Sequence, residues 1–150
     1  MIPLTMGEAE FGALAHIAGR LAFFEPLKGA ELEKLLSHIQ LFAFKAGETI
    51  FKKGDSADAL YIIYEGQVRI LMNRHWLWLI RREARLAPGN LFGEMALLEK
   101  RVRSAKAVAV QPTKLFVLLR ADFDALMQRN PLFAEGMRWV AERRKFEDSH

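Results

Sequence analysis

The feature that most limits the possible folds is a series of short β-rich segments between about residues 41 and 119. Glycine, proline and asparagine separate these segments at a spacing of roughly eight to twelve residues, which is typical of turns. Many short strands joined by such turns indicate a β-barrel or a β-sandwich. The clearest segments are Thr49–Phe51, Leu60–Ile63, Val68–Leu71, Val108–Val110 and Leu115–Leu118.

Helical periodicity replaces this pattern at both ends of the chain. Apolar residues recur at helical spacing from residue 8 to about 37, where Glu25–Gly29 separates two helices. The pattern returns after Ala121, with Asp122 as the expected N-cap, and Asn130–Pro131 separates two further helices. No linker or internal repeat divides the chain, so we predict one domain over residues 1–150. Its expected parts are a helical lead-in (about 8–40), a β-rich part (about 41–119) and C-terminal helices (about 121–147).

The composition excludes several classes of function. The chain has no cysteine, which excludes disulfides, zinc–thiolate sites, iron–sulfur clusters and thiol nucleophiles. Its four histidines are scattered, and no nucleophile–base set or triphosphate-binding loop is visible, so we predict no enzymatic activity, metal or cofactor. The N-terminus lacks the basic region of a signal peptide, and no apolar stretch approaches the length of about 18 residues that a transmembrane helix needs. We therefore expect a cytoplasmic protein without a transmembrane segment.

Charge is distributed unevenly along the chain. The net charge is +4, but residues 69–106 alone contain nine basic and three acidic side chains. A basic middle region suggests an anionic ligand or partner.

One stretch within this basic region interrupts the strand pattern, because Phe92–Leu98 has the composition of a turn followed by a short helix. The first N–H groups of a helix are free to bind phosphate. The guanidinium of Arg103 can bind two phosphate oxygens, and the hydroxyl of Ser104 adds a donor. An ionised Glu94 can only accept hydrogen bonds, which suits a sugar hydroxyl. The combination predicts a nucleotide site.

These residues resemble the phosphate-binding cassette of cyclic nucleotide-binding domains, the module of protein kinase A regulatory subunits, catabolite activator proteins and cyclic-nucleotide-gated channels. The resemblance covers about residues 23–145. It implies a mainly β fold with flanking α-helices: a double-stranded β-helix (a jelly-roll-like β-roll) with N-terminal helices and C-terminal hinge and lid helices. The matching segments are Ala46–Phe51, Gly54–Asp55, Tyr61–Val68, Leu86–Gly89, Phe92–Leu97 and Arg103–Ala105.

The resemblance also implies a ligand, cyclic AMP or cyclic GMP, with cyclic AMP favoured. Glu94 would accept a hydrogen bond from the ribose 2′-hydroxyl, and Arg103 would pair with the cyclic phosphate. Val102 stands where the family often has proline, a change that loosens the loop and removes no ligand contact. On the last helix, Arg138 or Trp139 is a candidate lid residue that would stack on the purine. The remaining expected site residues are Ile70, Phe92, Gly93, Met95, Ala96, Ser104 and Ala105.

Three alternatives stay open. Glu94 and Arg103 could form a structural ion pair that binds nothing. The apolar run Trp76–Ile80 could form a hairpin through which the domain binds a protein partner, with an unused nucleotide pocket. Direct DNA binding would need a recognition helix after the last helix, and the chain ends at His150, so we expect no sequence-specific DNA binding. We expect a cyclic nucleotide as ligand and a protein partner or fused effector, and a homo-oligomer stays open.

Overall fold

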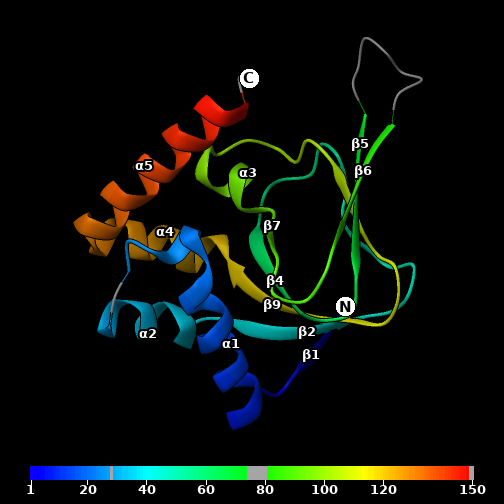
Figure 1. The fold of residues 1–150 in the computed structure, drawn as a ribbon, viewed down its shortest axis with the longest axis horizontal. Coiled ribbons are helices and arrows are strands. Elements are labelled where there is room, and N and C mark those ends of the chain that lie inside the picture. The colour runs from blue at the N-terminus through cyan, green and yellow to red at the C-terminus, as the bar shows by residue number, and fades with distance from the viewer. Residues whose placement is uncertain (28, 74–80, 149–150) are drawn as a thin grey trace.

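The computed structural model describes residues 1–27, 29–73 and 81–148, so the expected Trp76–Ile80 hairpin lies outside the described residues. Two antiparallel sheets form the centre of the described part (Figure 1). The first sheet has the strand order β1 (Ile2–Leu4), β2 (Gln40–Phe44), β9 (Thr113–Leu119), β4 (Ala59–Glu65) and β7 (Leu91–Phe92). The second has the order β3 (Thr49–Phe51), β8 (Lys106–Ala109), β5 (Val68–Asn73) and β6 (Arg81–Leu86).

Helices flank the first sheet, as Figure 1 shows, on the side away from the arm formed by β5 and β6. A short helix interrupts the strands between β7 and β8, at the place where the sequence predicts one. The helical segments are α1 (Glu8–Arg20), η1 (Ala22–Phe24), α2 (Ala30–Ser37), α3 (Glu94–Leu98), α4 (Arg120–Arg129) and α5 (Pro131–Asp148).

The two central strands of the first sheet, β4 and β9, are buried on both faces. Leu60 and Ile62 pack with the helices, whereas Tyr61 and Ile63, which point to the other face, pack in the interior between the sheets. Strand β9 alternates in the same way. Because both faces of these strands are buried, apolar residues occupy successive positions and the strands appear in the sequence as continuous apolar runs. Each large apolar side chain that is fully buried stabilises the fold by about 1.5–3 kcal/mol.

The order of helices, β-rich part and helices matches the expectation from sequence, with two corrections at the chain ends. Strand β1, which pairs with β2, was not anticipated, because three residues give too little periodicity to recognise. Asp122 was wrongly expected to be an N-cap: α4 begins at Arg120, with Leu119 in the capping position. A tertiary hydrogen bond from the Arg120 N–H to the Asp58 carbonyl (2.7 Å) accompanies this earlier start. The break at Asn130 is confirmed, and its side-chain oxygen accepts a hydrogen bond from the Phe133 N–H (3.1 Å).

Candidate functional site

The segment Phe92–Leu98 turns sharply from β7 into α3, and Gly93 makes this turn. Its φ of 78° lies in the left-handed region that glycine tolerates best. A Cβ atom at this position would lie 2.9 Å from Nη1 of Arg103 and 3.2 Å from the ring of Tyr61. Position 93 therefore requires glycine both for its backbone conformation and for the close approach of the arginine.

Arg103 extends its guanidinium into the interior beside this turn, and the residue is only 3% exposed. Nη1 donates to the Gly93 carbonyl at 2.6 Å and Nη2 to the Ala59 carbonyl at 2.5 Å, whereas Nε is buried without a hydrogen-bond partner. The backbone is held as well, because the Arg103 N–H donates to the Asp55 carbonyl and the Arg103 carbonyl accepts from the Gly54 N–H, both at 2.8 Å. The β3–β4 turn thus positions the arginine.

Two aromatic rings lie beside the guanidinium, and a third stacks on one of them. Its central carbon lies 4.1 Å from the ring centroid of Phe51 and 5.8 Å from that of Tyr61, and the Tyr61 ring stacks on Phe92 with centroids 5.1 Å apart. A cation over an aromatic face gains about 0.5–2 kcal/mol. Sequence reasoning recognised Phe51 and Tyr61 only as strand residues. Strand alternation could have indicated them, because both residues lie on the interior face of their strands.

Arg103 forms no ion pair with an acidic side chain among the described residues. Its guanidinium forms no ion pair in this part of the chain, with Glu94 or with any other carboxylate, so the structural ion pair considered above does not form. Burial lowers the pKa of Arg103, although Tyr61 and Asp58 nearby act in the opposite direction. Arginine nevertheless stays protonated in proteins. A buried cation that forms no ion pair with a described carboxylate favours the binding of an anion.

The structure brings most of the expected residues to this turn. Glu94, the first residue of α3, is only 7% exposed. Ala96 and Ala105 are buried and Met95 is half-buried, whereas Ser104 is exposed. Ile70 on β5 is half-buried against the same interior cluster that contains Tyr61 and Phe92.

Arg120, which the sequence alone did not single out, connects this region to helix α4. Its Nε donates to the Ala57 carbonyl at 2.5 Å, and its Nη2 donates to the Ala96 carbonyl of α3 at 3.4 Å. The first residue of α4 is therefore hydrogen-bonded both to the β3–β4 connection and to α3. No local pattern reveals this role, because an arginine at a helix start is ordinarily a solvated side chain.

The two candidate lid residues lie on the exposed side of α5. Trp139 is 57% exposed, and the guanidinium carbon of Arg143 lies 5.2 Å from its ring centroid. Arg138 is also exposed. The opposite face of α5 packs into the core cluster that contains the helices. The structure thus does not bring Arg138 or Trp139 to the turn at Gly93.

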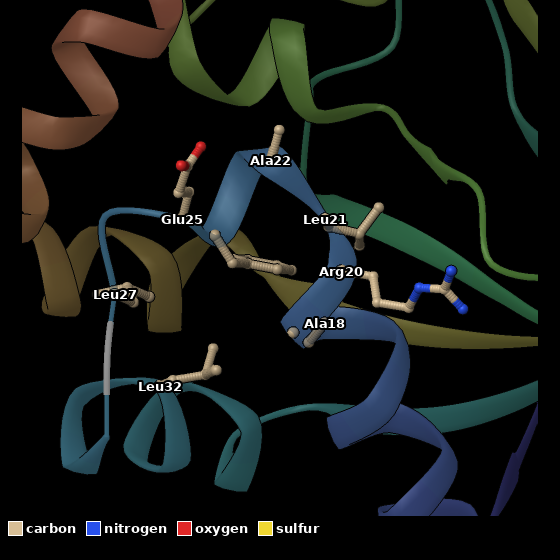
Figure 2. A pocket seen from close by; sticks show the side chains of 9 residues that line it. Ala18, Arg20, Leu21, Ala22, Glu25, Leu27 and Leu32 are labelled. Carbon is tan, nitrogen blue, oxygen red and sulfur yellow. The ribbon is translucent and has the colours of Figure 1, made fainter.

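A separate cavity of about 480 Å³ lies where the end of α1, η1 and α2 meet (Figure 2). Its walls are mainly apolar, with Arg20 and Glu25 among the lining residues, and it shares no residue with the turn at Gly93. Within the described ranges, no three His, Asp or Glu side chains gather closely enough to hold a metal ion. In the same part of the chain, no helix has the length and apolar character needed to cross a membrane.

Comparison with known proteins gives consistent matches. Residues 41–130 match the family model described as the cyclic nucleotide-binding domain. The chain is 42% identical to a cyclic AMP receptor protein of Thermus thermophilus, over 81% of this chain and 56% of that protein. It is 30% identical to a cyclic nucleotide-gated potassium channel of Rhizobium etli, over 87% of this chain and 35% of the channel.

A crystal structure of a cyclic nucleotide-binding domain from Methylobacillus flagellatus has the same fold, with a TM-score of 0.76 at 23% identity. The superposition covers 99% of this chain and 84% of that one. In contrast, this chain spans only about half of the Thermus protein and about a third of the Rhizobium channel.

Proposed function

Because this chain belongs to the cyclic nucleotide-binding domain family, we propose that it is the sensing module of a regulatory protein whose ligand is cyclic AMP rather than cyclic GMP. Membership of the family, which the residues around Gly93 and Arg103 predicted, is confirmed by the match over residues 41–130. The preference for cyclic AMP is supported by the Thermus relative, which is described as a cyclic AMP receptor protein. The domain senses its ligand and carries out no reaction on it.

The observation that carries this proposal is the Arg103 side chain, a buried cation that forms no ion pair with a carboxylate among the described residues. The cyclic phosphate supplies the missing negative charge, and the guanidinium exchanges its carbonyl acceptors for phosphate oxygens. Ser104, which is exposed, and the backbone N–H groups near Ala96 complete the phosphate shell. Glu94 accepts a hydrogen bond from the ribose 2′-hydroxyl, and Ile70 lines the wall of the pocket.

Ligand binding then changes the position of the C-terminal helices. If the phosphate draws α3 inward, the Ala96 carbonyl moves with it, and Arg120 transmits this movement to the start of α4. Helix α5 follows and brings Arg138 or Trp139 over the purine. The ligand shifts the population toward this closed arrangement only by as much as it binds that arrangement more tightly. The effector that reads the movement is a protein partner or a further part of a longer chain.

The proposal is tested by calorimetric titration of the domain with cyclic AMP, cyclic GMP and 5′-AMP. We expect micromolar or tighter binding of cyclic AMP, weaker binding of cyclic GMP and none of 5′-AMP. Arg103→Ala should weaken cyclic AMP binding roughly ten- to hundredfold, because a charge-assisted contact contributes about 1.5–3 kcal/mol. Glu94→Ala should weaken it less.

Arg129→Ala is the control, because Arg129 is an exposed arginine on α4 and its loss changes the net charge equally. Arg103→Lys serves as a second variant that keeps the charge if Arg103→Ala does not fold. Full-strength binding by either folded Arg103 variant would contradict the assigned pocket. The absence of heat with both cyclic nucleotides, from folded and nucleotide-free protein, would contradict the sensor function itself.

A further inference from the structure

The outer face of the second sheet is basic and is not covered by the helical core. The apolar cluster that joins the helices to the β-rich part draws strand residues from β1, β2, β4, β7 and β9, and none from the described strands of the second sheet. Figure 1 shows the helices on the opposite side of the molecule from the β5–β6 arm. A face without a helical cover is available to another molecule.

Strand alternation determines which side chains lie on this face. Val68 and Ile70 of β5 belong to the interior cluster, so Arg69 and Leu71 point outward. The same argument applies to the neighbouring strands, because Leu86 of β6 and both Ala107 and Ala109 of β8 lie in the interior. Among the residues whose side chains the structure describes, the outward positions of the three strands are Arg69, Leu71, Glu83, Arg85, Lys106 and Val108.

The register places two like charges directly opposite each other. Arg69 pairs with Arg85 across β5 and β6, an arrangement that destabilises a sheet unless the repulsion is offset. In the next row, Leu71 lies between Glu83 on β6 and Lys106 on β8. These positions therefore hold three cations and a single acid.

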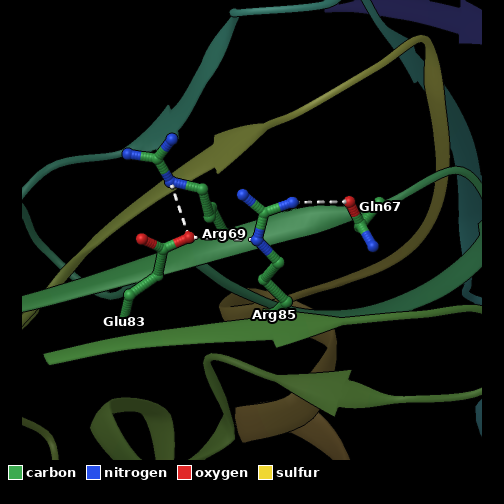
Figure 3. Close-up of polar contacts among 4 residues, drawn as sticks. All are labelled: Gln67, Arg69, Glu83 and Arg85. Carbon is green, nitrogen blue, oxygen red and sulfur yellow. Dashed lines mark hydrogen bonds and ion pairs between the residues drawn. The ribbon is translucent and has the colours of Figure 1, made fainter.

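One carboxylate holds both arginines. Oε1 of Glu83 lies 3.2 Å from Nε of Arg69 and 3.1 Å from Nε of Arg85, and Nη1 of Arg85 donates to the Gln67 side chain at 3.4 Å (Figure 3). Nε of Arg69 is buried and poorly aligned for a hydrogen bond to Glu83. The two Nη atoms of Arg69 have no hydrogen-bond acceptor among the described residues. The arginine side chains are 39% and 56% exposed, so their remaining donors are accessible.

We propose that this basic face, formed by Arg69, Arg85 and Lys106 on the second sheet, binds an acidic segment of a protein partner. Carboxylates of such a segment would take the unused guanidinium donors and relieve the Arg69–Arg85 repulsion. Leu71 and Val108, which are partly buried between the charges, suit a peptide with apolar contacts. A nucleic acid is disfavoured, because the described part of this face sets three cations beside two apolar side chains and a carboxylate, whereas affinity for a phosphate backbone comes from many Lys and Arg contacts.

The test uses a fluorescein-labelled peptide of eight residues in which Glu alternates with Ser, followed by fluorescence anisotropy at low and at moderate salt. We expect binding that weakens with salt. The double variant Arg69→Gln/Arg85→Gln should weaken it at least about fivefold. The matched control is Arg20→Gln/Arg129→Gln, which removes two exposed arginines from helices and should change affinity less than about twofold.

A second variant tests the same face in the opposite direction. Glu83→Gln removes the one acid among the described positions of this face and should tighten peptide binding, provided that circular dichroism shows an unchanged fold. Equal weakening in the control pair would overturn the proposal, because net charge alone would then explain binding. So would a lack of tightening in folded Glu83→Gln. Tighter, Arg69-dependent binding of a 20-base-pair DNA duplex or of phosphatidylserine vesicles would also overturn it, by assigning the face to another class of partner.

Discussion

Replacing Gly93 by alanine tests how the turn between β7 and α3 supports Arg103. An L-residue at a φ of 78° costs about 1–2 kcal/mol in backbone strain. The new Cβ would lie 2.9 Å from Nη1 of Arg103, so the guanidinium must move and lose its 2.6 Å hydrogen bond to the Gly93 carbonyl. A hydrogen bond of a charged group contributes about 1.5–3 kcal/mol. After partial relaxation, we expect a loss of about 3 kcal/mol in the free energy of unfolding.

Gly47→Ala separates the two contributions. Gly47 has a φ of 84°, close to that of Gly93, but no atom lies within 4 Å of its added Cβ. It should therefore lose only the strain of about 1–2 kcal/mol. For a domain of this length, each kcal/mol corresponds to about 2–4 °C, so Gly93→Ala should lower the melting temperature by about 6–12 °C.

Urea denaturation of both variants, with titration of cyclic AMP, measures the difference. Gly93→Ala should also weaken cyclic AMP binding, whereas Gly47→Ala should not. In a folded Arg103→Leu background, Gly93→Ala should cost less than it does in the unchanged protein, because the displaced guanidinium is gone and only the 3.2 Å approach to the Tyr61 ring remains. Equal losses of stability in the two single variants would refute the reasoning, since the contact with Arg103 would then contribute nothing.

Two further predictions concern packing and pH. Gly136→Ala would place a Cβ 2.4 Å from Cβ of Pro26, so α5 must shift, and we expect a lower free energy of unfolding in urea. The control is Gly12→Ala in α1, where the added Cβ meets open space and should raise the free energy of unfolding by about 0.5–1 kcal/mol. A stabilising Gly136→Ala would contradict this account. Burial raises the pKa of Tyr61 from 10.0, so the unfolded chain ionises first. The stability that the buried, un-ionised Tyr61 contributes is complete below about pH 10, the pKa of tyrosine in the unfolded chain. It is lost as the pH rises through the higher pKa of Tyr61 in the folded protein. Urea denaturation at pH 8 and 10.5 should therefore show a smaller alkaline loss in Tyr61→Phe than in the unchanged protein, with Tyr64→Phe as the control, and an equal loss in all three would argue against it.

The main strands and the helix break could be recognised from the sequence, because the patterns that indicate them lie within a few neighbouring residues. Buried strands such as β4 and β9 read as apolar runs, and the break at Asn130 follows from the proline after it. The start of α4 could not be recognised in the same way. Asp122 is a good capping residue by type, but a hydrogen bond from Arg120 to a distant strand connection accompanies an earlier start.

The candidate site was predicted in part. Gly93, Glu94 and Arg103 were chosen because each has a residue type that suits one group of a nucleotide, and spacing along the chain was sufficient for that choice. The rings that surround the guanidinium were not predicted, since Phe51 and Tyr61 lie on strands remote in sequence. The same is true of the hydrogen bonds from Arg120 to Ala57 and Ala96.

By itself, the sequence determined the positions of turns, the alternation of the strands and the set of residues that can bind an anion, because backbone propensity and side-chain chemistry are local properties. Only the tertiary structure decided the environment of that set. Arg103 donates to the carbonyl of Ala59, which is 44 residues away, and it lies against Phe51 from another strand. The like-charge pair Arg69–Arg85 likewise exists only through strand register. These contacts arise when the sheets close on each other, and they depend on long-range packing that no local pattern contains.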